Sequence, residues 1–237
     1  MARDRGTDRL LDGVLGALCS FLLHGRCAGA AVMMSRFIAL EGADGSGKST
    51  QVERLADWLR SEGEQVITVR EPGSTSLGER VRDILLDGDE PLCAEAEALL
   101  FLSSRAQLLD EVIEPALEAG QWVIADRFHL STVVYQGLAG ELGEARAAQL
   151  CQVVLGDRRP SLNIVLEIHV EQLSKRLALR SGATDRFESR PGLAQRTVAA
   201  FEKVVGIAGD RVVRIDGRLD ADQVEARIRQ EVVDVLR

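Results

Sequence analysis

A stretch of small and polar residues near the start of the chain has the composition of a phosphate-binding loop. It consists of Gly42, Ala43, Asp44, Gly45, Ser46, Gly47, Lys48, Ser49 and Thr50. Residues 42–49 fit the pattern GxxxxGK(S/T), in which glycines let backbone N–H groups approach phosphate oxygens. The amine of Lys48 would reach the β- and γ-phosphates, and the hydroxyl of Ser49 would coordinate Mg²⁺. The loop therefore predicts binding of ATP or GTP, but it does not define the acceptor.

Three further segments combine charged and polar side chains in places where a ligand could bind. They are residues 70–73 (REPG), 100–107 (LFLSSRAQ) and 126–136 (DRFHLSTVVYQ). The first and third follow short apolar runs, and the second lies within a long helical pattern. Ligands of open α/β sheets bind outside the carboxyl ends of the strands, so these segments should gather around the phosphate loop.

The elements that would position these residues follow from the hydrophobic pattern. Apolar runs at 37–40, 66–69, 122–125, 162–168 and 212–215 read as strands. Helical patterns separate them. One has Val52, Leu55, Ala56 and Leu59 on one face, another runs from about 94 to 118, and the last carries Val224, Ile228 and Val232. Nearly continuous apolar strands that alternate with amphipathic helices indicate an α/β domain whose parallel sheet is covered on both faces.

Composition limits the kinds of ligand. The net charge of −8 argues against nonspecific binding of nucleic acid, which needs a broad basic surface, whereas a few converging arginines suffice for a nucleotide. The four cysteines, Cys19, Cys27, Cys93 and Cys151, show no metal-binding or paired spacing. Unpaired thiols and a need for ATP favour the cytoplasm.

The first 34 residues differ from the rest. Basic residues precede an apolar run at 14–23, which resembles a secretory signal but is too short to span a bilayer. A loosely ordered extension and an upstream start, with Met33 or Met34 as the true beginning, are the other readings. The expected division is an N-terminal extension at 1–34 and one kinase domain at 35–237.

Taken together, the motifs resemble those of bacterial thymidylate kinases. That family has an REPGG-like turn, an LLF-x-x-x-R helix and a DR-x-x-x-S-x-x-A-Y-Q segment in the same order, and the resemblance runs from about Arg36 to the C-terminus. Ser74, Val134 and His169-Val170 depart from the common pattern without removing a required polar group. The resemblance implies a P-loop kinase with a five-stranded parallel sheet, helices on both faces and a short lid. It also implies transfer of the γ-phosphoryl group of ATP to dTMP with Mg²⁺, in a homodimer without nucleic-acid or membrane partners.

The resemblance assigns the base and sugar pocket. Phe101 would stack on thymine, Arg105 would donate to its O4, and Asp44 would lie near the 3′-hydroxyl. The pocket would be completed by Glu71, Pro72, Ser131, Thr132 and Gln136. The Gln136 amide is suited to reading a pyrimidine edge.

The resemblance also assigns the groups around the reacting phosphates. Arg127 and Arg82 would hold the acceptor phosphate, and Asp126 would bind Mg²⁺ with Ser49 or orient the acceptor. The expected catalytic residues are Lys48, Asp126, Arg127 and Arg180.

A cluster of arginines predicts the lid. Arg176, Arg180, Arg186 and Arg190 surround residues 181–183, and we expect Arg176 and Arg180 to bind ATP. The resemblance implies a transition-state arginine that comes either from the phosphate loop or from the lid. No basic residue lies beside Asp44 in the loop, so this arginine is expected in the lid, with Arg180 as the candidate.

Two alternatives share the phosphate loop. Another nucleoside monophosphate kinase would not be expected to combine Phe101, Arg105 and Gln136. A GTPase-type switch or regulatory nucleotide-binding module usually reads guanine through Asn-Lys-x-Asp, but the only asparagine, Asn163, lies in an expected strand.

Overall fold

The computed structural model describes residues 36–88, 91–179, 186–187 and 189–235, which all fall within one compact unit, 34–237. The N-terminal segment 1–34 and Arg180 of the expected lid lie outside the described residues. Among the residues that are described, no helix combines the length and apolar composition needed to cross a membrane.

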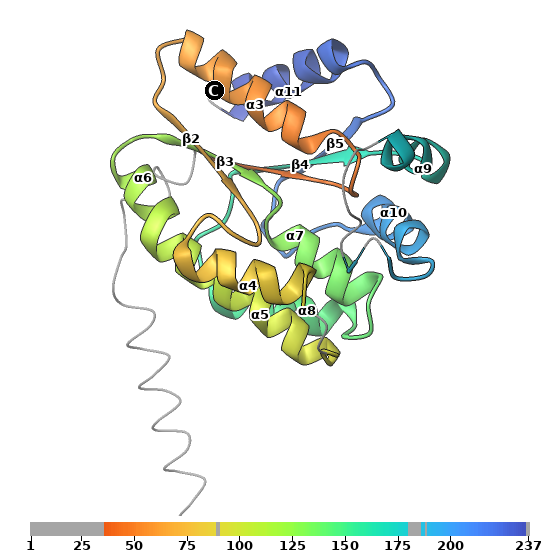
Figure 1. Cartoon of the computed structure of the whole chain (residues 1–237). Helices are drawn as coiled ribbons and strands as arrows, with labels where there is room; N and C mark the ends of the chain where they lie inside the picture. The colour runs from red at the N-terminus through yellow and green to blue at the C-terminus, as the bar shows by residue number, and fades with distance from the viewer. Residues whose placement is uncertain (1–35, 89–90, 180–185, 188, 236–237) are drawn as a thin grey trace, which may run out of the picture. The chain divides into compact units, whose positions relative to one another are not determined.

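A five-stranded, all-parallel sheet forms the centre of the domain (Figure 1). Its strands are β1 (Phe37–Glu41), β2 (Val66–Arg70), β3 (Trp122–Asp126), β4 (Leu162–Glu167) and β5 (Val212–Asp216), in the order β2-β3-β1-β4-β5. The predicted sheet is confirmed, with each strand within two residues of its expected end. Because β1 is central and Leu40 pairs with Asp126 of β3, the loops that follow these two strands start side by side.

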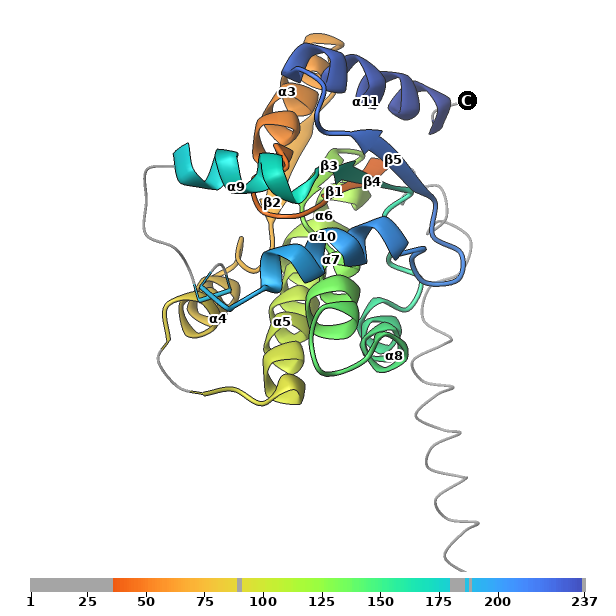
Figure 2. The same cartoon turned by 90° about the vertical axis from the view of Figure 1, so that its right-hand side faces the viewer.

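Helices cover both faces of the sheet, as Figures 1 and 2 show. On one face lie α3 (Lys48–Ser61) and α11 (Ala221–Val235). On the other lie α4 (Ser76–Leu86), α5 (Ala94–Leu108), α6 (Glu114–Glu118), α7 (His129–Thr132), α8 (Glu144–Leu155) and α10 (Leu193–Lys203), while α9 (Val170–Leu179) follows β4.

Alternating side chains of the strands divide the core between these two layers. Ile38 and Leu40 of β1 pack in one cluster with the predicted apolar stripes of α3 and α11. Phe37 and Ala39 pack in the other cluster with the opposite helices. Both faces of a parallel sheet are thereby buried, which explains the uninterrupted apolar strands in the sequence.

Two stretches of π-helix interrupt the helical layer. The helix predicted at 94–118 is α-helical only to Leu108, continues as η2 (Leu109–Ile113) and returns to α-helix at Glu114. Pro115 lacks the N–H that an α-helix would use at this point, and the wider turn accommodates its ring. The second stretch, η3 (Val133–Leu138), follows α7 and carries Tyr135 and Gln136.

Candidate active site

Glycine conformations shape the phosphate loop between β1 and α3. Gly42, Gly45 and Gly47 have φ values of 142°, 81° and 102°, which other residues rarely adopt. A Cβ on Gly42 would also lie 2.7 Å from the backbone oxygen of Leu166. Helix α3 begins at Lys48, as predicted, so its N-terminal N–H groups point into the loop, where they can bind an anion.

Lys48 is buried against its own loop. Its Nζ donates to the carbonyl oxygens of Gly42 at 3.1 Å and Ala43 at 2.9 Å. Burial, assisted by the nearby Arg127, lowers the pKa of Lys48 to about 8, although Asp44 and Asp126 act in the opposite direction. The amine is thus fixed where a phosphate held by the loop would meet it.

Ser49 and Asp126 join the loop to the end of β3. The Ser49 hydroxyl donates to Oδ2 of Asp126 at 2.6 Å. A hydroxyl and a carboxylate are hard oxygen ligands of the kind that Mg²⁺ prefers. The described residues contain no cluster of three or more His, Cys, Asp or Glu side chains that could enclose a metal. The chemistry of this pair therefore fits two of the ligands that a Mg²⁺ ion would need.

Arg127 and Asp44 form the junction between the phosphate loop and the loop after β3. Their side chains are ion-paired, and Tyr135 donates its hydroxyl to Asp44 Oδ2 at 2.9 Å. Burial alone would raise the pKa of Asp44, but Arg127 and Lys48 outweigh it and hold this pKa well below its usual range. Arg127 has a φ of 71°, a strained value for a non-glycine residue and typical of functional sites.

A cavity beside this junction gathers every residue that the sequence assigned to the acceptor. Those residues are Asp44, Glu71, Pro72, Arg82, Phe101, Arg105, Arg127, Ser131, Thr132 and Gln136. The lining also includes Leu86, Phe128, Tyr135 and Phe187. The structure thus brings the predicted residues together, and their roles remain predictions.

A second cavity lies over the phosphate loop and includes Lys48, Ser49 and Asp126 in its lining. Four residues line both cavities: Asp44, Glu71, Arg82 and Arg127. A phosphate of the donor on the loop and the phosphate of an acceptor in the first cavity would therefore meet where Arg82 and Arg127 line both cavities.

Arg105 and Glu71 form a buried ion pair in the acceptor cavity. The Arg105 Nε donates to Glu71 at 2.8 and 3.0 Å, and both side chains are at most 3% exposed. Nη2 also donates to Thr132 Oγ1 at 3.0 Å and to the Phe128 carbonyl at 3.1 Å. Burial raises the pKa of Glu71, and Arg105 offsets part of that rise.

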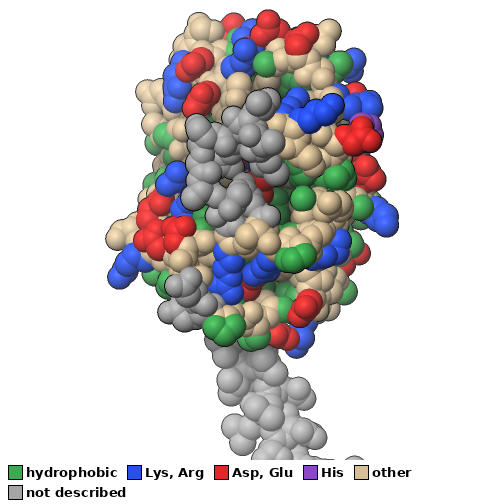
Figure 3. Space-filling view, turned by 45° about the vertical axis from the view of Figure 1, so that its right-hand side comes forward, with side chains coloured by type: hydrophobic (Ala, Val, Ile, Leu, Met, Phe, Trp, Pro, Cys, Tyr) green, Lys and Arg blue, Asp and Glu red, His purple; other side chains and the backbone are tan. Residues whose placement is uncertain are grey.

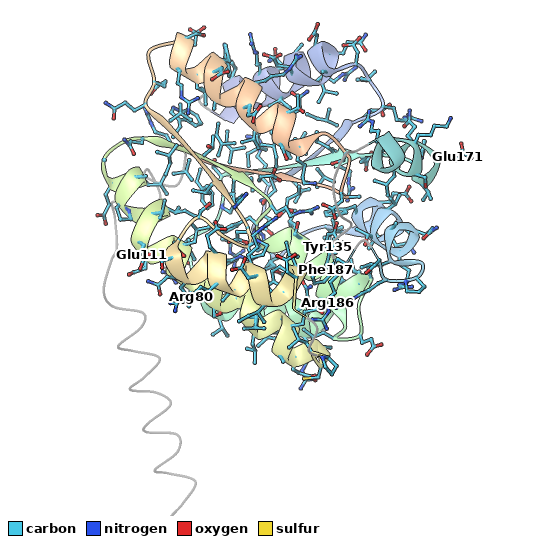
Figure 4. The ribbon with its side chains drawn as sticks, viewed as in Figure 1. Arg80, Glu111, Tyr135, Glu171, Arg186 and Phe187 are labelled. Atoms are coloured by element: carbon cyan, nitrogen blue, oxygen red, sulfur yellow. The ribbon has the colours of Figure 1, made fainter. Side chains whose placement is uncertain are left out.

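Aromatic rings close one side of the acceptor cavity. Phe187 meets Phe101 edge-on at 5.8 Å and Tyr135 at 6.4 Å between centroids. Figure 4 shows Tyr135 and Phe187 close together near α7, although they lie 52 positions apart in the chain. Such a surface suits a planar apolar base.

The sequence missed several residues that build the cavity. Glu41 is fully buried at the end of β1 and accepts hydrogen bonds from the backbone N–H groups of Phe128 and Ser131 at 2.9 and 3.2 Å. It thus anchors the start of α7, where Ser131 and Thr132 lie. In the sequence, the only mark of Glu41 is that a carboxylate directly follows the apolar run of β1. Tyr135 lies in the segment 126–136 and Phe187 follows Arg186 of the expected lid, but the sequence assigned a role to neither.

Ser74 explains one departure from the family pattern. Its φ is 65°, in the region that favours glycine. Its hydroxyl accepts from Arg70 N at 2.8 Å, and its N–H donates to Glu79 at 2.8 Å. These bonds hold the turn after β2 without a second glycine.

The arginines of the expected lid contact different parts of the site. Arg176 donates to the carbonyl oxygens of Gly45 and Ser46 at 3.2 Å, beside the phosphate loop. Arg190 is ion-paired with Glu97 of α5 instead, and the Arg186 backbone N–H donates to the Leu86 carbonyl. The structure therefore does not place Arg190 with Arg176 in a single phosphate clamp.

The charged surface on one side of the domain is mixed. Among the described residues, Figure 3 shows acidic and basic side chains interspersed on the face in view. This mixed surface fits the net charge of −8.

Comparisons with known proteins agree with this geometry. A sequence model of a family described as thymidylate kinase matches residues 40–228, more than half of the chain. A thymidylate kinase of Chlamydia trachomatis serovar D is 41% identical over 202 residues, covering 84% of this chain and 98% of that protein. Thymidylate kinases of Ectopseudomonas mendocina (43% identity; 80% and 95% coverage) and Protochlamydia amoebophila (37%; 84% and 91%) are also similar. The chain belongs to the thymidylate kinase family.

Proposed function

We propose that the chain transfers the γ-phosphoryl group of ATP to the 5′-phosphate of dTMP, giving dTDP and ADP. The observation that carries this proposal is the pair of adjoining cavities, which share Arg82 and Arg127. One cavity has the phosphate loop, and the other has aromatic rings and polar side chains suited to a nucleotide base. Membership of the thymidylate kinase family supports thymidylate as the acceptor.

In this mechanism the protein positions two anions and stabilises charge. A phosphate oxygen of dTMP attacks the γ-phosphorus in line, and the bond from that phosphorus to the oxygen of the leaving ADP breaks. Lys48 and Arg127 neutralise charge on either side of the transferring group. A Mg²⁺ ion held by Ser49 and Asp126 would supply further charge on the β- and γ-phosphates. No side chain forms a covalent intermediate.

The acceptor cavity orients the nucleotide. We assign stacking on the base to Phe101, donation to the base O4 to Arg105, and contact with the sugar to Asp44. Each of these residues lines the cavity. The buried Glu71 carboxylate fixes the plane of the Arg105 guanidinium through three hydrogen bonds, so a remaining N–H can be aimed at the base.

We also propose the lid, the assembly and the location. Arg176 lies against the phosphate loop, which supports ATP binding by that segment, and Arg180 stays the candidate for the transition-state arginine. Membership of the family supports a homodimer, and we name Leu99 of α5 and Val153 of α8, which are 54% and 81% exposed, as candidates for its contact surface. The requirement for ATP supports a cytoplasmic location, and the proposed partners are ATP and dTMP.

The test is a transfer assay with ATP and Mg²⁺ against dTMP, dUMP, dCMP, dGMP and AMP, with ADP release measured. We expect the highest kcat/KM with dTMP and little ADP release without an acceptor. A higher kcat/KM for another monophosphate would refute thymidylate as the substrate. Release of phosphate from GTP without any acceptor would favour a GTPase-type switch.

A further inference from the structure

Gln136 can present either of two opposite chemical groups to the acceptor cavity. Its side chain is 3% exposed on η3 and forms part of the cavity lining. An amide has an oxygen that only accepts hydrogen bonds and an NH₂ group that only donates them. Which end faces the cavity therefore decides which edge of a base the residue can read.

Glu97 of α5 settles the orientation of that amide. The Gln136 Nε2 donates to Glu97 Oε1 at 3.0 Å, and both side chains are buried. An ionised carboxylate has no proton to donate, so only the NH₂ end of Gln136 can face it. The amide oxygen is thereby left for the cavity.

Arg190 is the ion-pair partner of Glu97. Its guanidinium is ion-paired with Glu97 Oε2 and donates to Oε1 at 3.4 Å. The same group lies over the ring of Phe187, 4.5 Å from its centroid. Removal of Arg190 would therefore take away the ion pair that holds the Glu97 carboxylate in place beside Gln136.

We propose that Glu97, supported by Arg190, is a positioning residue that sets which pyrimidine the cavity accepts. It fixes the Gln136 oxygen as an acceptor for a ring N–H, such as N3–H of thymine or uracil. Cytosine has no N3–H, and the lone pair at its N3 would repel the lone pairs of the amide oxygen. The inference rests on the proposed function, because it concerns the base of that acceptor.

The test compares Glu97→Gln with the unmodified full-length protein on dTMP, dUMP and dCMP. A glutamine at this position can donate or accept, so the Gln136 amide becomes able to turn. We expect the dTMP-to-dCMP ratio of kcat/KM to fall about tenfold or more, the scale of a lost polar discrimination. The dTMP-to-dUMP ratio should not change, because both bases carry N3–H. If the role of Glu97 were purely structural, the kcat/KM values for dTMP, dUMP and dCMP would fall together.

Two further variants and a control sharpen the comparison. Arg190→Met should lower the same ratio, because it removes the ion pair that holds the Glu97 carboxylate in place beside Gln136. In a Gln136→Leu background, Glu97→Gln should have no additional effect on the ratio, since it acts through Gln136. The matched control is Glu95→Gln, which makes the same change on the same helix in an exposed ion pair with Arg146.

The outcomes separate this inference from the proposed function. Unmodified protein that transfers phosphate to none of the three nucleotides would refute the proposed function and this inference with it. Active protein whose dTMP-to-dCMP ratio is unchanged in both Glu97→Gln and Arg190→Met would refute the inference alone. If Glu97→Gln does not fold, the ratio measured for Arg190→Met decides.

Discussion

Replacing Arg105 by alanine removes one partner of the ion pair in the acceptor cavity. The Arg105 and Glu71 side chains are 1% and 3% exposed, so Glu71 would be left as an uncompensated buried carboxylate. Breaking such a pair costs about 3–5 kcal/mol. For a chain of this size each kcal/mol corresponds to about 2–4 °C in Tm, so we expect Arg105→Ala to lower Tm by roughly 6–20 °C.

Two comparisons isolate the electrostatic part of that loss. Combining Arg105→Met with Glu71→Gln removes both charges and should recover at least half of the lost Tm, because the unpaired charge carries most of the cost. Arg146→Ala breaks the exposed pair with Glu95, whose side chains are 63% and 52% exposed, and should cost less than about 1 kcal/mol. Thermal unfolding followed by circular dichroism measures all three.

Enzyme kinetics on the same variant test the second role of Arg105. The residue lines the acceptor cavity but not the cavity over the phosphate loop. A hydrogen bond from a charged donor contributes about 1.5–3 kcal/mol, so the KM for dTMP should rise about 10- to 100-fold, with a much smaller change for ATP. A Tm within about 2 °C of the unmodified protein would contradict the buried-pair argument. Equal changes in both KM values would contradict base reading.

Four further predictions follow from the site. Lys48→Met should abolish transfer in a folded protein, because it removes positive charge beside the γ-phosphate; most of the normal turnover in a folded variant would refute the phosphate-loop assignment. The pKa of Lys48 is lowered to about 8, so kcat/KM for ATP should fall as pH rises through that value and the amine loses its charge; a flat profile from pH 7 to 9 would contradict this. A chain that starts at Met34 should keep its activity and Tm, and loss of either would show that the preceding segment contributes to the folded domain. Arg180→Ala should lower kcat about 100-fold with small changes in KM, as expected for a transition-state contact, whereas Arg176→Ala should mainly raise the KM for ATP; normal turnover in both would refute the lid proposal.

The fold was predictable because local patterns and global architecture agree in this chain. The apolar runs are long enough to be strands buried on both faces, and the stripe at Val52, Leu55, Ala56 and Leu59 lies in the core as expected. The helix predicted at 94–118 was right in extent but not in hydrogen bonding, since a π-helical turn precedes Pro115. Hydrophobic periodicity does not determine which backbone carbonyl accepts the hydrogen bond from each N–H.

The membership of the acceptor cavity was also predictable, but its internal contacts were not. Motif residues such as Phe101 and Gln136 were identified because the family motifs mark them. Glu97 and Glu41 stand outside those motifs, and their importance comes from a buried carboxylate meeting a donor far along the chain. No periodic signal marks such a residue.

The sequence by itself determined the parallel α/β architecture, the phosphate loop and the set of side chains available for phosphoryl transfer. Strand period, glycine spacing and helix starts are local properties, so they can be read along the chain. Only the tertiary structure decided that Arg105 is paired with Glu71, that Arg190 contacts Glu97 and that the Gln136 amide donates to Glu97. The physical reason is that a buried charge must find a partner wherever the fold brings one, and sequence distance does not limit that choice.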